Sequence, residues 1–218
     1  MSDAGRPSGP GRRAEPGGVP TGNTFDKYGS AHPVVRRLMA GFERSAHELL
    51  ARAAPASLLD VGCGEGVLTA RWARTVPGEV VGVDLEDPAL AAHWASARAA
   101  GPPNLRFVAM SAEALEFGAG AFELVAATEV LEHVADPGVA LRELARVAAT
   151  WLLVSVPREP LWRVLNLARG AYVTALGNTP GHLHHFSRRG LLALLGEYGE
   201  IAEVRTPLPW TMALVRVR

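Results

Sequence analysis

The residues with the clearest chemical potential are a group of glycines after a short apolar stretch. Gly62, Gly64 and Gly66 lie within five residues and follow SLLDV, which carries Asp60 near its end. Glycine lets the backbone adopt positive φ and lets a ligand approach the main chain closely. About twenty residues further on, Asp84 ends the stretch EVVGVD, where its carboxylate can accept both hydroxyl groups of a ribose. The spacing therefore predicts a site for a nucleoside-bearing cofactor.

The glycine spacing leaves the identity of that cofactor open. A nicotinamide-binding loop reads G-x-G-x-x-G, and its third glycine allows close packing of the helix that follows. Here the pattern is G-x-G-x-G, and Val67 occupies the position of that third glycine. The loop alone favours a different nucleoside cofactor without excluding a nicotinamide one. Cys63 lies inside the loop, and we expect it to serve packing rather than nucleophilic chemistry.

The elements that must position these residues alternate between strand-like and helix-like stretches. Residues 33–54 carry apolar side chains at helical spacing and predict a first helix. The predicted strands are SLLDV, EVVGVD, NLRFVAM, FELVAAT, TWLLVSV and PWTMALVRVR, and the further helices are VLTARWART, PALAAHWASARAAG, DPGVALRELARVA and RRGLLALLGEYG. Continuous apolar strands that alternate with helices predict an α/β fold, with a mostly parallel sheet covered on both faces.

The composition limits the classes of protein and partner. The chain has 218 residues, of which 48% are hydrophobic, enough for one sizeable core. Its 22 basic residues balance 22 acidic ones, which argues against nucleic acid as the main partner. Cys63 is the only cysteine, so no internal disulfide can form and a reducing compartment is expected. No apolar run is long enough for a membrane span or a signal peptide, so we expect a cytoplasmic protein.

Two segments lie outside this alternation. Residues 1–23 are rich in glycine and proline and nearly lack large apolar side chains, so we expect a disordered tail ahead of a domain at residues 24–218. Residues 157–187 form an unusually long connection that carries leucine and tryptophan at helical spacing. We favour the interpretation that this segment is a helical lid that covers a hydrophobic substrate. A helix that completes the core and a helix at a bilayer surface are the alternatives.

A third motif points to a family. The stretch AFELVAATEVLEHVADP, residues 121–137, contains a strand, an acid at its end and a Leu-Glu-His-Val step. Together with LLDVGCGEG and VVGVD, it resembles the class I S-adenosylmethionine-dependent methyltransferases. The likeness is strongest to the branch with ubiquinone- and menaquinone-pathway enzymes and many small-molecule O-methyltransferases. It runs from about Tyr28, where relatives fold a tyrosine over the cofactor, to the C-terminus.

The resemblance implies a fold and an activity. The fold is a single Rossmann-like domain with a mostly parallel seven-stranded sheet and an antiparallel last strand. The activity is methyl transfer from S-adenosylmethionine to a small-molecule or lipid-like acceptor, with oxygen preferred. Methylation of carbon or nitrogen in a hydrophobic natural product is the alternative. A nicotinamide-dependent oxidoreductase is opposed by the glycine spacing, and a non-catalytic binding module is opposed by the intact glycine loop.

The family's cofactor contacts carry over to particular positions of this sequence. They are Asp60, Gly62, Gly64, Gly66, Asp84, Leu85, Ser111, Ala112 and Thr128. By this resemblance Asp60 organises the loop amides or the cofactor's amino group, Asp84 holds the ribose hydroxyls, and Leu85 packs on the adenine. Ser111 departs from the family, which usually has an aspartate there to meet the adenine amine. A neutral oxygen should contribute less than a carboxylate.

Two histidines are candidate general bases, since an unperturbed imidazole has a pKa of about 6.5. His133 follows the fourth strand, where some sugar O-methyltransferases of similar sequence place a catalytic histidine. His182 follows the proposed lid, where relatives often have a histidine shortly before a Phe-Ser pair. His184 and His185 are weaker candidates in the same cluster, GHLHHFS. We expect no metal, because no cysteine or aspartate lies near this cluster in sequence and this branch transfers methyl groups without one.

Overall fold

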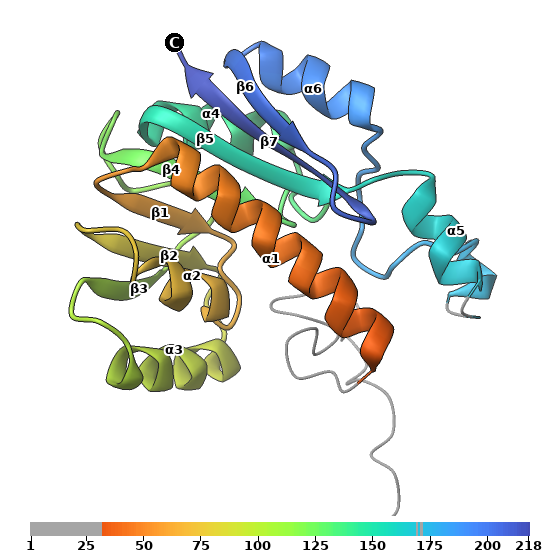
Figure 1. The fold of residues 1–218 in the computed structure, drawn as a ribbon, viewed down its shortest axis with the longest axis horizontal. Helices are drawn as coiled ribbons and strands as arrows, with labels where there is room; N and C mark the ends of the chain where they lie inside the picture. Colours follow the sequence, from red (N-terminus) through yellow and green to blue (C-terminus); the bar gives the residue numbers. More distant parts are fainter. Residues whose placement is uncertain (1–31, 169, 171) are drawn as a thin grey trace, which may run out of the picture.

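A seven-stranded sheet forms the centre of the computed structural model, which describes residues 32–168, 170 and 172–218 (Figure 1). The strands are β1 Leu58–Val61, β2 Val80–Asp84, β3 Leu105–Ala109, β4 Phe122–Thr128, β5 Ala148–Pro157, β6 Gly199–Arg205 and β7 Trp210–Val217. Their order across the sheet is β3-β2-β1-β4-β5-β7-β6. The tail expected at residues 1–23 and the tyrosine Tyr28 lie outside the described residues.

The strand pairing confirms the predicted sheet. β1 pairs in parallel with β2 and β4, and the same parallel pairing extends to β3 on one side and β5 on the other. The last strand, β7, is antiparallel to both β5 and β6. β6 is the strand that no apolar stretch had located, and most of its residues are only half-buried. An edge strand of this kind lacks the continuous apolar pattern of the central strands.

Helices cover both faces of the sheet. They are α1 Pro33–Ala53, α2 Val67–Trp72, α3 Pro88–Ala100, α4 Pro137–Val147, α5 Leu161–Ala168 and α6 Arg188–Gly196, with a short 3-10 helix η1 at Val173–Ala175. The core on one face includes buried side chains of α1 and α2, whereas α4 and α6 contribute to the core on the opposite face. α3 lies beside α2 near the β3 edge (Figure 1). The central strands are therefore buried on both sides.

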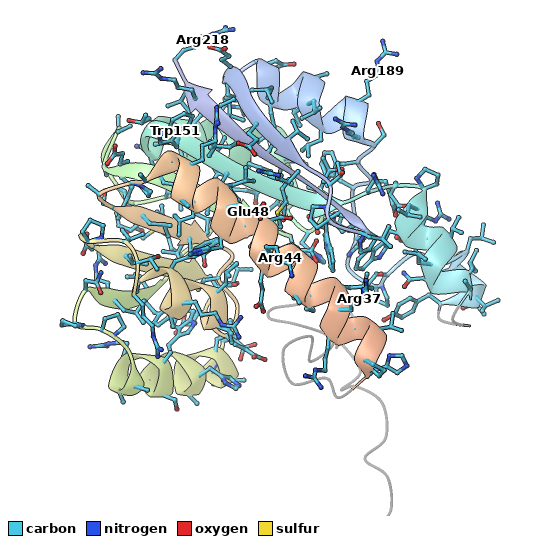
Figure 2. All side chains as sticks on the ribbon, viewed as in Figure 1. Arg37, Arg44, Glu48, Trp151, Arg189 and Arg218 are labelled. Carbon is cyan, nitrogen blue, oxygen red and sulfur yellow. The ribbon has the colours of Figure 1, made fainter. Side chains whose placement is uncertain are left out.

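α1 connects the core to the carboxyl edge of the sheet. Phe42 and Leu49 are buried against the strands, whereas Arg37, Arg44 and Glu48 lie on the exposed side of the helix (Figure 2). This division is the amphipathic pattern that the sequence predicted for residues 33–54. The N-terminal half of α1 extends past the ends of the central strands (Figure 1). That half can therefore contribute side chains to a site at the carboxyl edge.

The long segment 157–187 lies beyond the carboxyl end of β5 and the amino end of β7 (Figure 1). It contains α5 and η1, and its large apolar side chains Val164, Leu167, Val173 and Leu176 are exposed. Among the described helices none combines the length and the apolar composition that crossing a bilayer requires.

Candidate functional site

A cavity of about 480 Å³ lies at the carboxyl ends of β1, β2 and β4. The loops after these strands supply its polar wall, and Phe42, Trp162 and Trp210 belong to its apolar wall. All the predicted cofactor and catalytic residues except Gly66 line it: Asp60, Gly62, Gly64, Asp84, Leu85, Ser111, Ala112, Thr128, His133 and His182. Ligands of open parallel sheets bind at this edge. The topology thus brings residues from separate motifs to one site.

The glycine loop needs its glycines for two different reasons. Gly62, Gly64 and Gly66 all have positive φ, between 53° and 77°. A Cβ on Gly66 would lie 2.5 Å from the ring of Phe107, so this glycine makes room for the core and lies outside the cavity lining. Gly62 and Gly64 line the cavity with main-chain atoms. Gly66 therefore supports the loop from behind, while the other two face the ligand space.

Asp84 ties the glycine loop to the end of β2. Its Oδ2 accepts a hydrogen bond from the Gly64 amide at 2.7 Å, and its Oδ1 accepts one from the Leu85 amide at 2.8 Å. Burial raises the pKa of Asp84 above its usual range, and the two amide hydrogen bonds act in the opposite direction. Trp94 holds the other side of the loop, because its Nε1 donates to the Gly64 carbonyl at 2.8 Å. Asp84 and Trp94 thus hold the loop through the amide and the carbonyl of the same residue, Gly64.

Asp60 is almost completely buried below the loop, with 2% of its surface exposed. Its Oδ2 accepts a hydrogen bond from the Thr69 hydroxyl at 2.6 Å, whereas no described group donates to the buried Oδ1. Burial raises the pKa of Asp60 to about 7; the Thr69 hydrogen bond lowers it, and the nearby charge of Asp84 raises it. The loop amide of Gly64 is bound by Asp84 rather than by Asp60. One oxygen of Asp60 therefore has no hydrogen-bond donor among the described residues.

The β3 side of the cavity contains Ser111, the position where the sequence departs from the family that it resembles. Ser111 and Ala112 both line the cavity beside Leu85. The Ser111 hydroxyl accepts a hydrogen bond from the Glu113 amide at 3.2 Å. The Ser111 side chain therefore accepts a hydrogen bond within its own turn and also lines the cavity. Its role towards an adenine stays a prediction.

The Cys63 thiol is held in its neutral form. Burial raises the pKa of Cys63 well above its usual range, and the carboxylates Asp60 and Asp84 add to that rise. Because the thiolate is the reactive species, this environment disfavours nucleophilic chemistry. The packing role predicted for this cysteine agrees with its surroundings.

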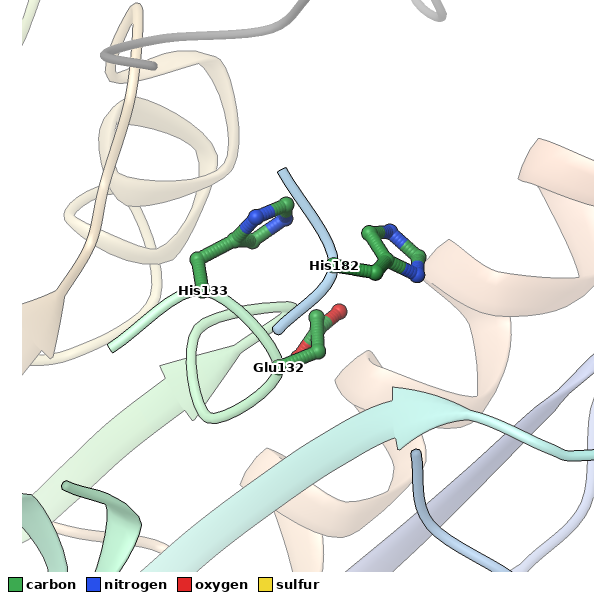
Figure 3. A group of neighbouring side chains, drawn as sticks. All are labelled: Glu132, His133 and His182. Carbon is green, nitrogen blue, oxygen red and sulfur yellow. The ribbon is translucent and has the colours of Figure 1, made fainter. Parts of the chain in front are cut away.

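The lining of the cavity also contains both predicted histidines. The rings of His133 and His182 meet edge to face with centroids 4.9 Å apart, and His133 Nδ1 lies 2.9 Å from the Gly181 carbonyl oxygen. Glu132 lies next to them, so these three side chains converge from two segments far apart in the sequence (Figure 3). Of the other two histidines in the cluster, His184 has its Nε2 3.3 Å from the Ala135 carbonyl oxygen. His185 has its Nε2 2.8 Å from Oδ1 of Asn178.

Sequence reasoning missed two features of this end of the site. Glu132 was read only as part of a motif, although it lies beside both histidines with 1% of its surface exposed. An aromatic wall was also missed: Trp162 stacks on His182 at 5.9 Å and contacts Trp210 at 5.8 Å. Phe42 of α1 completes the wall against Trp210 at 4.9 Å. The only sequence signal for Glu132 was its position directly before His133.

Comparisons with known proteins identify similar chains. A family model described as "Methyltransferase domain" matches residues 59–150. Ubiquinone biosynthesis O-methyltransferase of Albidiferax ferrireducens is 36% identical over 135 residues, 60% of this chain and 52% of that protein. Demethylmenaquinone methyltransferase of Thermus thermophilus is 34% identical over 131 residues, 57% of this chain and 59% of that protein. The chain thus spans little more than half the length of these relatives.

A solved structure shares the fold. It is magnesium protoporphyrin IX methyltransferase from Synechocystis with bound SAH, which covers 87% of this chain and 90% of its own length. The TM-score is 0.66 and the sequence identity is 17%, so this likeness concerns the fold alone.

Proposed function

Because the chain belongs to the class I S-adenosylmethionine-dependent methyltransferase family, we propose that it transfers a methyl group from S-adenosylmethionine to an oxygen of a small-molecule acceptor. One observation carries this proposal: a single cavity joins the glycine loop and Asp84 to His133 and His182. A donor held at the first group would face an acceptor held at the second. The names of the relatives support a quinone-type acceptor.

The cofactor end of the cavity fits the polar groups of S-adenosylmethionine. The buried Oδ1 of Asp60, to which no described group donates, would accept from the ammonium group, and the carboxylate of Asp84 would accept from the ribose hydroxyls. Leu85 and Ala112 would flank the adenine. The cofactor supplies an electrophilic methyl group on a sulfonium. What remains for the protein is to align the acceptor and to remove its proton.

The acceptor end supports a molecule with a flat hydrophobic body. Phe42, Trp162 and Trp210 form one continuous aromatic wall of the cavity. Trp162 belongs to α5, and its Nε1 donates to the Thr179 hydroxyl at 2.8 Å, which ties α5 to the end of the same segment. We therefore assign residues 157–187 as a lid over the acceptor, because this segment brings α5 to the cavity.

We assign removal of the acceptor's proton to His133 or His182. An imidazole needs to reach the acceptor hydroxyl directly or through one water, and His133 and His182 both line the cavity at this end. Their edge-to-face contact keeps the two rings within one small region. The single cysteine favours a reducing compartment, so a cytoplasmic location is part of this proposal.

The proposal is tested by incubating the protein with S-adenosylmethionine and a panel of phenols, catechols and quinols, followed by mass spectrometry. We expect the product to carry one added methyl group. An O-methyl ether should be stable to base during isolation. His133→Gln or His182→Gln should lower turnover by about 10²–10⁴ while leaving S-adenosylhomocysteine affinity unchanged. His185→Gln is the matched control, since this ring is exposed and bonded to Asn178. Product carrying the methyl group on carbon or nitrogen would contradict O-methylation.

A further inference from the structure

The helix α5 buries a polar side chain and exposes apolar ones. Val164 and Leu167 are exposed, whereas Asn166 is the one fully buried residue of the helix, with 4% of its surface exposed. A helix that only completed a core would bury its leucines and leave the amide in solvent. Asn166 lines the cavity, and so does Thr179, which follows η1 in the same segment. The packing of α5 therefore places a polar group in a largely aromatic wall.

Asn166, Thr179 and Trp162 form one hydrogen-bonded group. Nδ2 of Asn166 donates to the Gly177 carbonyl at 2.8 Å and to the Thr179 hydroxyl at 3.2 Å. Nε1 of Trp162 donates to the same hydroxyl at 2.8 Å. A backbone carbonyl can only accept, so the amide nitrogen of Asn166 must face Gly177. The orientation of the side-chain amide is therefore determined by its partners.

These contacts leave one donor and one acceptor for a ligand. A hydroxyl group has two acceptor lone pairs and one proton. Asn166 and Trp162 use both lone pairs of Thr179, and no described residue accepts its proton. The Oδ1 of Asn166 likewise receives no hydrogen bond from the part of the chain that the structure describes. Because polar groups this buried are costly without partners, the arrangement favours a ligand that supplies them.

The pair Asn166 and Thr179 lies close to one of the two candidate bases. The His182 amide donates to the Thr179 carbonyl at 3.1 Å. Trp162 contacts both residues, since it donates to the Thr179 hydroxyl and stacks on the His182 ring at 5.9 Å. An acceptor the size of one aromatic ring can therefore reach the imidazole with one oxygen and the pair with another.

We propose that Asn166 and Thr179 bind a hydroxyl group of the acceptor other than the one that is methylated, and so determine which acceptors are selected. This inference rests on the proposed function. A hydroxyl matches both groups, because it accepts from Thr179 and donates to Oδ1 of Asn166. A carbonyl or an ether oxygen can only accept, which leaves Oδ1 of Asn166 without a donor. The pair therefore discriminates diols from analogues with a single hydroxyl.

The test compares acceptors that differ by one hydroxyl group. The probes are the ortho, meta and para dihydroxybenzenes and the corresponding phenol, all with the same short apolar chain. Calorimetry with S-adenosylhomocysteine present gives the affinity for each probe, and mass spectrometry with S-adenosylmethionine gives kcat/KM. The unchanged chain should bind at least one diol about 5- to 150-fold more tightly than the phenol, because a buried partner left unpaired weakens binding by this factor.

The variants separate recognition of the acceptor from support of the lid. Thr179→Val keeps the shape of the side chain but removes the hydroxyl, and it should lower the preference for the diol by about 5-fold or more. Thr179→Ser keeps the hydroxyl and should retain the preference. Thr174→Val is the matched control, because it makes the same change at an exposed residue of η1 outside the cavity lining. A change that only loosens the lid should weaken diol and phenol binding equally.

The outcomes distinguish this pair from the proposed function. The role of the pair is overturned if the unchanged chain binds no diol or prefers none. It is also overturned if a folded Thr179→Val variant weakens diol and phenol binding by the same factor, since Thr179 then only holds the lid. Equal kcat/KM for diol and phenol would likewise refute the pair and leave the proposed function in place. A preference in binding that depends on Thr179, without methyl transfer to any probe, would refute the proposed function alone.

Discussion

Replacing Asp60 by asparagine should abolish a pH dependence of cofactor binding. The pKa of Asp60 is raised to about 7 by burial, so the side chain is half-protonated near neutral pH. An ammonium group at Oδ1 favours the ionised form, so binding should release a proton below pH 7 and strengthen as the pH rises. A group with this pKa is about one-tenth ionised at pH 6 and about nine-tenths ionised at pH 8. Affinity for S-adenosylhomocysteine should therefore rise about tenfold across that range.

Asp60→Asn removes the charge but keeps an oxygen for the Thr69 hydroxyl. A hydrogen bond to a charged group contributes about 1.5–3 kcal/mol, so the variant should bind S-adenosylhomocysteine about 10- to 150-fold more weakly at pH 8. At pH 6 the deficit should shrink by about tenfold, because the unchanged protein has then lost most of its own charge. Titration calorimetry at several pH values measures both affinities, and their ratio cancels the ionisation of the ligand.

The raised pKa of Asp60 should also make the stability of the ligand-free chain depend on pH. The pKa of Asp60 is raised on folding from 3.8 to about 7, so folding takes up a proton between these values. The contribution of Asp60 to stability is therefore full below about pH 4 and is lost as the pH rises through about 7. Asp60→Asn should accordingly unfold at a higher temperature than the unchanged chain at pH 8. If the unchanged chain and Asp60→Asn show the same pH dependence of affinity and of unfolding temperature, the role assigned to Asp60 is refuted.

Two further predictions concern the support of the glycine loop. Gly66→Ala should destabilise the fold by about 1–3 kcal/mol, because its Cβ would lie 2.5 Å from Phe107 at a φ of +77°. Gly41→Ala is the matched control, since nothing lies within 4 Å of its Cβ position inside α1, and it should stabilise by about 0.5–1 kcal/mol. Thermal unfolding distinguishes them, and equal effects would contradict the packing argument. Trp94→Phe removes the hydrogen bond to the Gly64 carbonyl and should weaken S-adenosylhomocysteine binding about 2- to 10-fold by calorimetry. Unchanged affinity would mean that the loop is held without it.

The sequence pattern was sufficient for the central strands and their helices. β1, β2 and β4 are buried on both faces, and burial on both faces requires the continuous apolar runs that identified them. The sequence did not locate β6 because an edge strand exposes part of each face: Ile201 and Glu203 are both only half-buried. A strand of this kind is defined by its pairing with β7, which no local pattern contains.

The candidate site was predictable where it depends on local spacing. The glycine loop and Asp84 come from strand ends of fixed separation, and the parallel register then brings them together. The convergence of Glu132 with His182 depends on the path of the long segment, which the sequence does not specify. The hydrogen bond from Trp94 to the Gly64 carbonyl likewise depends on how α3 packs, which no local sequence pattern contains.

The central claim is that this cavity binds S-adenosylmethionine through Asp84, and calorimetric titration with S-adenosylhomocysteine tests it most directly. We expect one molecule bound per chain and no comparable response to NADH. Asp84→Ala should weaken binding by about 2–4 kcal/mol, or about 30- to 700-fold, through the loss of charge-assisted hydrogen bonds. Asp87→Ala, which removes the side-chain cap of α3 but keeps the Asp84 carboxylate, should bind S-adenosylhomocysteine about as tightly as the unchanged chain does. Tight NADH binding without S-adenosylhomocysteine binding, or unchanged affinity in a folded Asp84→Ala variant, would contradict the claim.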